Sequence, residues 1–291
     1  DTVVATGRQI GVVIRANTAN PTWGSRTADD NVVRDSDLSG NQLGITFAFE
    51  GARNEYLRND LSDTADVALA VNGDSGVIIE DNDYRDSFIG IALSNLDAQG
   101  RTVIAGADLT TITGTYGLRV HNVRNARFEQ IEIGSGARQS LWWSGGSTGN
   151  TFDQITARGH TFGLLSQDAH DNLVTRSDFS WTGVGLQATG IDLRLGSSGN
   201  VFDDVTVHQR LFGAQIAGTG GGTTIRGSDL SDNHNCVFAQ VTDPAAGQTF
   251  HDLQLTGCTG NALTVAFDNL LDVRDVDFVG SNVGLSLRGM S

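Results

Sequence analysis

The stretch Asn31–Phe47, NVVRDSDLSGNQLGITF, decides the fold, because its pattern returns every 22–28 residues along the chain. We take Asp37 as the anchor of the first copy and find eleven copies in all. The anchors are Asp37, Asp60, Asp83, Asp108, Glu132, Thr156, Asp178, Thr206, Asp229, Gln254 and Asp277. A repeat of this length predicts a solenoid of stacked coils.

Each copy has apolar residues at fixed positions relative to its anchor. The residue after the anchor is apolar in every copy, from Leu38 to Phe278, and so is the residue four before it, from Val33 to Val273. Around each anchor the chain therefore alternates between inward and outward positions, as a strand with one buried face does. A second short strand is expected about eight residues after the anchor, as in Gly44–Phe47.

Short strands joined by Gly, Asn, Asp and Ser turns cannot bury an apolar face alone. Stacked copies can, if each strand pairs in parallel with the same strand of the next coil. We therefore predict an all-β fold, a single-stranded right-handed parallel β-helix of about 11–12 coils and on the order of 55 Å long. An antiparallel sandwich would not predict the same residue types in the same columns over eleven copies. We expect one domain over residues 1–291, with residues 1–30 as an N-terminal cap or partial coil and residues 31–291 as eleven coils.

The repeat has the form Asn-x-Val-x-x-Ser-Asp-Leu-Ser-x-Asn-x-x-Gly-Ile-x-Phe in its first copy. In this form it resembles the right-handed β-helix repeats of the pectin-lyase-like superfamily, which includes carbohydrate-binding-and-hydrolysis domains and NosD-type periplasmic proteins. The resemblance covers nearly the whole chain and implies the fold. It does not select a chemistry, because that superfamily contains lyases, hydrolases, epimerases, tailspikes, adhesins and binding modules.

Composition excludes several classes of partner. The net charge is −15, which argues against binding to nucleic acid or to an anionic membrane, and no apolar run is long enough to insert into a membrane. All 19 basic residues are arginine, so a lyase or epimerase that takes its base from lysine is excluded. The two cysteines, Cys236 and Cys258, lie in adjacent coils, where either a disulfide or two buried free thiols would fit.

The anchors form a row of outward-facing carboxylates at the spacing of adjacent strands. Like charges this close are unfavourable, and arginines in neighbouring columns are expected to compensate them: Arg34, Arg58, Arg176, Arg226 and Arg274. Our main prediction for the row is therefore structural: an Asp/Arg ladder that keeps the outer face of the sheet soluble. No cofactor is required, but Ca²⁺ would suit such oxygen ligands. The candidate metal ligands are Asp35, Asp37, Asp81 and Asp83.

A second group of polar residues lies in coils six to eight. Carboxylates one or two coils apart would be roughly 5–10 Å from each other, a range that covers both mechanisms of glycoside cleavage. The candidate catalytic residues are Asp153, Asp178, Asp203, Asp204, Arg176 and His208. The Asp203-Asp204 pair and Arg158-Gly159-His160 are similar to fragments of the polygalacturonase signature, but their order is reversed, and Asn-Thr-Asp and Arg-Ile-Lys are absent.

Aromatic and basic residues of the same coils are candidates for binding sugar rings, because flat aromatic faces beside polar groups suit them. The candidate substrate-binding residues are Trp142, Trp143, Trp181, His160 and Arg210. Adjacent tryptophans in a strand point to opposite faces, so one of Trp142 and Trp143 should be buried and the other exposed. Phe162 and Phe212 share a column and are expected in the core.

We therefore predict an extracellular, cell-surface or periplasmic protein whose partner is a polysaccharide, bound in a groove over coils five to eight. Hydrolysis of that polysaccharide is a further hypothesis. The alternative is a non-catalytic stalk, adhesin or tailspike-like segment of a larger surface protein, for which a trimer or another oligomer would be expected.

Overall fold

The computed structural model describes residues 3–15, 27–97, 102–159, 161–185, 187–218, 221–241, 247–266 and 271–288. The regular secondary structure of these residues consists of β-strands in two parallel sheets. Sheet A contains β2 (Val32–Arg34), β4 (Glu55–Leu57), β6 (Ile78–Glu80), β8 (Val103–Ala105), β9 (Asp108–Leu109), β11 (Arg127–Ile133), β13 (Thr151–Ala157), β15 (Leu173–Asp178), β17 (Val201–Thr206), β19 (Thr224–Asp229), β21 (Gln248–Gln254) and β23 (Leu271–Asp277). Sheet B contains β1 (Ile10–Arg15), β3 (Leu43–Ala52), β5 (Val67–Ser75), β7 (Ile89–Asp97), β10 (Tyr116–Arg124), β12 (Gln139–Thr148), β14 (Phe162–His170), β16 (Gln187–Arg194), β18 (Arg210–Gly218), β20 (Asn235–Val241), β22 (Asn261–Ala266) and β24 (Val283–Arg288).

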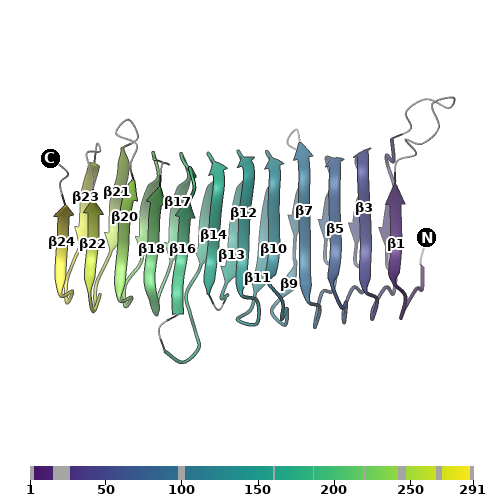
Figure 1. Ribbon diagram of the computed structural model, residues 1–291, viewed down its shortest axis with the longest axis horizontal. Coiled ribbons are helices and arrows are strands. Elements are labelled where there is room, and N and C mark those ends of the chain that lie inside the picture. Colours follow the sequence, from purple (N-terminus) through teal and green to yellow (C-terminus); the bar gives the residue numbers. More distant parts are fainter. Residues whose placement is uncertain are drawn as a thin grey trace.

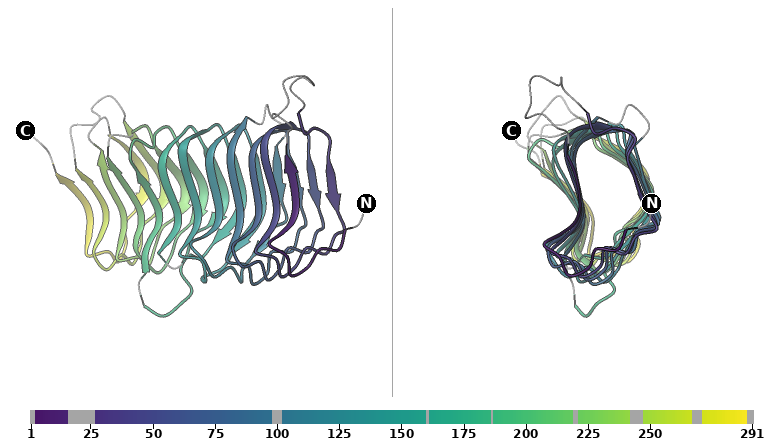
Figure 2. Two further views of the ribbon diagram at one scale, coloured as in Figure 1. Left: turned by 45° about the vertical axis from the view of Figure 1, so that its right-hand side comes forward. Right: turned by 90° about the vertical axis from the view of Figure 1, so that its right-hand side faces the viewer.

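The chain winds through the two sheets in turn, and each strand pairs in parallel with the equivalent strand of the next coil. Figure 1 shows the strands of sheet B side by side in chain order from β1 to β24. The end-on view of Figure 2 shows that the coils superimpose as a closed tube. The predicted all-β fold, a parallel β-helix, is confirmed.

The predicted alignment of the repeats is also confirmed. Backbone pairing joins each anchor to the anchor of the next coil at all ten steps, from Asp37–Asp60 to Gln254–Asp277. The residue after the anchor is fully buried in the first ten coils, from Leu38 to Leu255. A slip of one residue would turn such an apolar column outward, so burial fixes the register.

Stacked side chains fill the interior. The rings of Phe128 and Phe152 lie parallel with 4.4 Å between their centroids, and Trp143 stacks on Phe152 at 4.6 Å. Trp143 is fully buried, whereas Trp142 is half-buried on the outer face of β12, as predicted for adjacent residues of one strand. Nowhere in the described part of the chain is there a helix that could cross a membrane.

Polar ladders occupy the inner corners of the tube. The side-chain amide of Asn150 donates to Oδ1 of Asn172 at 2.9 Å, and Asn172 donates to Oδ1 of Asn200 at 3.0 Å. Such a ladder satisfies polar groups that would otherwise be buried without partners. In coils nine and ten a buried disulfide joins Cys236, on β20, to Cys258, in the turn between β21 and β22, which settles the two alternatives left open by the sequence.

The segment before the first anchor contributes a further partial coil. Val4 pairs with Asp37, and β1 pairs in parallel with β3. Residues 16–26, the central part of the excursion considered as a cap, lie outside the described residues.

Candidate functional site

Three adjoining hollows run along one corner of sheet A, with volumes of about 430, 540 and 350 Å³. The first two share Gly106 and Asp108, and the last two share Gln154 and Thr156. We call this continuous feature the axial groove. The groove extends over coils three to eight. One wall consists of the anchor residues, and the other consists of the residues that lie two positions before the anchors in the sequence. At about 4.8 Å per coil, the groove is on the order of 24 Å long.

The backbone conformation at one position explains why the corner exists. The residue two before the anchor has a positive φ in all eleven coils, between 49° and 64°. This left-handed conformation turns the strand, so that this residue and the anchor both project outward while the residue between them points inward. We call these eleven residues the corner row. Glycine and aspartate tolerate a positive φ well, whereas Arg58, Gln130, Gln154 and Arg176 adopt it at a cost.

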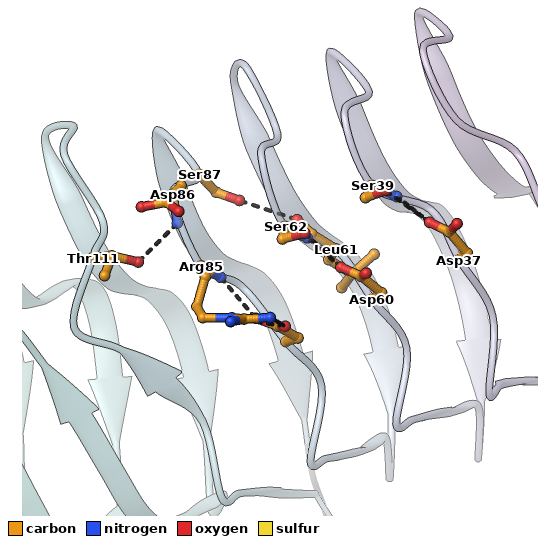
Figure 3. Close-up of polar contacts among 10 residues, drawn as sticks. Asp37, Ser39, Asp60, Leu61, Ser62, Arg85, Asp86, Ser87 and Thr111 are labelled. Carbon is orange, nitrogen blue, oxygen red and sulfur yellow. Dashed lines mark hydrogen bonds and ion pairs between the residues drawn. The ribbon is translucent and has the colours of Figure 1, made fainter.

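The anchor aspartates have a structural role of their own. Oδ1 of Asp37 accepts hydrogen bonds from the backbone N–H of Ser39 at 3.2 Å and from its hydroxyl at 2.7 Å, and Asp60 binds Ser62 in the same way (Figure 3). An aspartate that binds the second residue after it stabilises a tight turn. The repeated Asp-x-Ser pattern is therefore explained by the turn after each anchor.

Three of the four candidate calcium ligands, Asp35, Asp37 and Asp83, bind other side chains of the protein. Asp35 accepts two hydrogen bonds from Arg58, at 2.8 and 3.0 Å, and the hydrogen bond from this guanidinium lowers the pKa of the Asp35 carboxyl. Asp83 binds Arg85 in the turn after it, while Asp81 lines the groove. Across the described residues, no group of three or more His, Cys, Asp or Glu side chains is arranged to hold a metal ion. The Ca²⁺ site stays a prediction.

An Asp/Arg ladder is present on the outer face of sheet A, but the prediction that its arginines compensate the anchors is wrong: Arg58, Arg176, Arg226 and Arg274 pair with Asp35, Asp153, Asp203 and Asp272, which are not anchors, and no ion pair of Arg34 is found among the described residues. Asp153 binds both Nε and Nη2 of Arg176, and Oδ2 of Asp203 accepts a hydrogen bond from Arg226 at 2.7 Å. Each of these two ion pairs joins two adjacent coils. Asp153 and Arg176 lie on β13 and β15, and Asp203 and Arg226 lie on β17 and β19, which are paired strands. Exposed ion pairs add little stability individually, but these compensate carboxylates that lie beside the anchor row.

The candidate catalytic residues are divided between the groove and this ladder. Arg176, Asp178 and Asp204 line the same hollow of about 350 Å³. Asp153 and Asp203 lie outside it in their ion pairs, and Nε2 of His208 lies 3.1 Å from Oδ2 of Asp229. The structure thus brings three of the six residues together.

Of the charged and amide side chains that line the groove, five make no hydrogen bond or ion pair within the described part of the chain: Asp81, Gln130, Glu132, Gln154 and Asp204. Both glutamines lie in the largest hollow and both are exposed. The two glutamines are not among the site residues predicted from the sequence. The signal that could have identified them is the residue two before the anchor, where an amide stands in place of Gly, Asp or Arg.

The aromatic and basic candidates lie away from the groove lining. Trp143 and Arg210 are fully buried and Trp181 is 7% exposed, so a ligand at the surface cannot contact the first two. Trp142 faces outward on sheet B, stacked on Tyr116 with 5.0 Å between the centroids. His160 lies outside the described residues.

The expectation that Phe162 and Phe212 lie in the core is wrong. Both are half-buried on the outer face of sheet B, where Thr189 separates them in one column. Arg194 lies over the ring of Phe162, and Phe238 packs edge-on against Phe212. Aromatic residues recurring in a column indicate stacking, but they do not by themselves indicate which face of the sheet they occupy.

Arg210 is a buried structural residue. Its guanidinium donates to the backbone carbonyls of Phe179 at 3.0 Å, Gly159 at 2.8 Å and Ser180 at 3.4 Å, and thus joins three coils. Burial lowers the pKa of Arg210 to about 10, which leaves the side chain charged at neutral pH. It supports the corner at the long insertion between the anchors Asp178 and Thr206.

Comparison with known proteins concerns the fold. A family model described as right handed beta helix region matches residues 95–259, which is more than half of the chain and includes most of the axial groove. No curated protein matches the chain.

Proposed function

The chain belongs to the right-handed β-helix region family, and from this premise we propose that it binds a linear polysaccharide along the axial groove. Family membership is compatible with either a carbohydrate-related or a structural role, so the proposal rests on the groove. The observation that carries it is the position of Gln130 and Gln154. They stand side by side in the largest hollow, in left-handed backbone, with amides that bind no other side chain.

This backbone conformation has a physical cost that no internal contact of the two amides offsets. The arginines of the same row differ, because Arg58 binds Asp35 and Arg176 binds Asp153. The corner of the tube requires this conformation in every coil, but it does not require an amide at the position, and the internal contacts of the fold do not use these two amides. A primary amide can donate to one sugar hydroxyl and accept from another, and two amides about 4.8 Å apart would contact successive positions of an extended chain.

An extracellular, cell-surface or periplasmic location is part of the proposal. The Cys236–Cys258 disulfide supports it, because disulfides persist in oxidising compartments and are rare in the cytosol. The alternative role, a non-catalytic stalk or adhesin segment, would need the fold but would give no reason for the free amides of the groove.

The test is retention of the protein on a panel of neutral, acidic and basic polysaccharides. Thr156 lines both the second and third hollows, so Thr156→Trp should fill the groove and abolish retention without lowering the melting temperature. Gln254→Trp is the matched control, because Gln254 is an anchor in coil ten, beyond the groove, and should leave retention unchanged. If Thr156→Trp is retained as well as the wild type, or if no polysaccharide retains the wild type, the proposal is refuted.

The same incubations decide whether binding leads to cleavage. Asp178 and Asp204 line one hollow and come from adjacent coils, a spacing that glycoside hydrolysis can use. Release of reducing ends by the wild type, and its loss in Asp204→Asn, would extend the function from binding to hydrolysis. No release from a polysaccharide that is bound would limit the function to binding.

A further inference from the structure

The charge of the axial groove differs from that of the sheet beside it. Six carboxylates line the three hollows: Asp81, Asp83, Asp108, Glu132, Asp178 and Asp204. Only two arginines line them, and both are already bound: Arg85 holds Asp83, and Arg176 turns to Asp153 outside the groove. On the outer face of sheet A, Asp153 and Asp203 are paired with arginines, whereas most of the carboxylates in the groove are not.

Three of these carboxylates are free of any side-chain hydrogen bond or ion pair in the described residues: Asp81, Glu132 and Asp204. Glu132 lies in the largest hollow, next to Asp108 on the adjacent strand. Asp204 lies in the third hollow, where it shares the space with Asp178. Both are exposed, so their oxygens are accessible to a ligand.

The turn contacts of the neighbouring aspartates also leave acceptor atoms available. Asp108 uses Oδ1 for both of its bonds to Thr110, at 2.9 and 2.6 Å, and Asp178 uses Oδ1 to bind the N–H of Ser180 at 2.8 Å. Oδ2 of Asp178 lies 3.8 Å from Arg158, and Oδ2 of Asp108 makes no hydrogen bond. A carboxylate is an acceptor without hydrogens of its own, so a ligand must supply the donors.

The chemistry of the lining therefore selects among polysaccharides. No aromatic side chain lines the three hollows, which leaves hydrogen bonds and charge to provide recognition. A polyuronate would bring further negative charge into a groove that carries four more negative than positive charges, and would be repelled. A chain bearing protonated amines would supply both the donors and the opposite charge.

On this basis we propose that the natural ligand of the groove is an amino-sugar polysaccharide with free, protonated amino groups. The amines contact Glu132 and Asp204, and the glutamine amides between them bind the sugar hydroxyls. This inference rests on the proposed function, since it names the class of polysaccharide for the same groove.

The experiment compares two oligomers that differ mainly in charge. Glucosamine oligomers of six residues and their fully N-acetylated counterparts are titrated into the protein by calorimetry, at a pH at which the free amines are protonated. We expect the free-amine oligomer to bind at least tenfold more tightly than the acetylated one. Raising the salt from 50 to 500 mM should reduce this preference, because exposed charges are screened.

Variants locate the effect. Glu132→Gln and Asp204→Asn each remove one free carboxylate of the groove and should together bring the two affinities within about threefold of each other. Asp275→Asn is the control, because Asp275 occupies the corner row in coil eleven, outside the groove. A loss of preference in Asp275→Asn equal to that in the groove variants would overturn the assignment to the groove.

The possible failures can be told apart. If the acetylated oligomer or another neutral glycan binds as tightly as the free-amine oligomer, and Thr156→Trp still abolishes binding, the inference on charge is wrong while polysaccharide binding stands. If a polyuronate binds best, with or without Ca²⁺, the inference is likewise refuted. If no glycan of any charge binds, the proposed function fails, and the inference fails with it.

Discussion

Replacing Gln130 and Gln154 by glycine should make the protein more stable and a weaker polysaccharide binder. Both residues have a positive φ, of 54° and 56°, and neither side chain has an internal partner in the described residues. The substitution relieves the backbone and removes the two amides that we assign to the ligand. Stability and binding should therefore change in opposite directions, which is the signature of a residue kept for function.

The gain in stability follows from two opposing terms. A left-handed conformation costs an L-residue roughly 1–2 kcal/mol. Glycine avoids this cost but loses about 0.5–1 kcal/mol through its greater freedom in the unfolded chain. The difference is about 0.5–1 kcal/mol at each site, so the double variant should unfold roughly 2–6 °C higher than the wild type.

The loss in affinity follows from the hydrogen bonds. A net hydrogen bond contributes about 0.5–1.5 kcal/mol, and the two amides can each make at least one with a sugar hydroxyl. We expect a loss of about 2 kcal/mol for the double variant, which corresponds to a rise in Kd of roughly thirtyfold. Asp275→Gly, in the same backbone row but outside the groove, should leave the Kd unchanged.

Thermal unfolding and calorimetric titration with the best-bound oligosaccharide measure the two effects. An unchanged Kd in a stabilised double variant would show that the ligand does not use these amides and would remove the main support for the groove. A lower melting temperature would show that the left-handed backbone imposes no strain at these positions. Either result refutes the reasoning.

Two further predictions concern the interior. Burial raises the pKa of Asp74 to about 6, above the value of about 4 of an aspartate in an unfolded chain. The buried neutral carboxyl therefore stabilises the folded state fully below about pH 4, and this contribution to the free energy of unfolding is lost as the pH rises through 6. Asp74→Asn should therefore raise the free energy of unfolding in urea by about 2–3 kcal/mol at pH 7.5 and hardly change it at pH 4; an equal gain at both pH values would contradict the ionised carboxylate as the cause. Arg210→Met should lower the free energy of unfolding by about 2–4 kcal/mol, because it leaves three buried carbonyls without a donor, whereas Arg226→Met on the surface should change it by less than about 1 kcal/mol. Equal effects of the two substitutions would show that Arg210 does not support the corner.

Much of the fold could be predicted from the sequence, because burial acts on every coil in the same way. Leu38 and its ten counterparts must all point inward if the coils stack, so the hydrophobic pattern fixes the anchors and the pairing of the strands together. The orientation of Trp142 and Trp143 followed from the same alternation. For Phe162 and Phe212 the argument failed, because recurrence in a column was taken as burial without asking which side of the strand the column occupied.

The groove could not be predicted in the same way. It depends on the left-handed residue two positions before each anchor, and this position is filled by residues as different as Asp35, Gly106, Gln130 and Arg176. No single residue type marks the bend, and hydrophobic periodicity does not register it. Three catalytic candidates, Arg176, Asp178 and Asp204, line one hollow because their coils are adjacent. The other three, Asp153, Asp203 and His208, form ion pairs, and their partners could be identified only from the register of sheet A.

A β-helix places every outward residue about 4.8 Å from its counterparts on the two adjacent coils, so charged residues on its surface will usually find partners. Arg58 with Asp35 and Arg226 with Asp203 are pairs of this kind, one coil apart. In such a fold, a charged or polar residue on the surface is therefore weak evidence of a site, because the stacking explains it. The informative residues are those that the stacking leaves without a partner inside a hollow, and Gln130 and Gln154 are two such residues on adjacent coils of one groove.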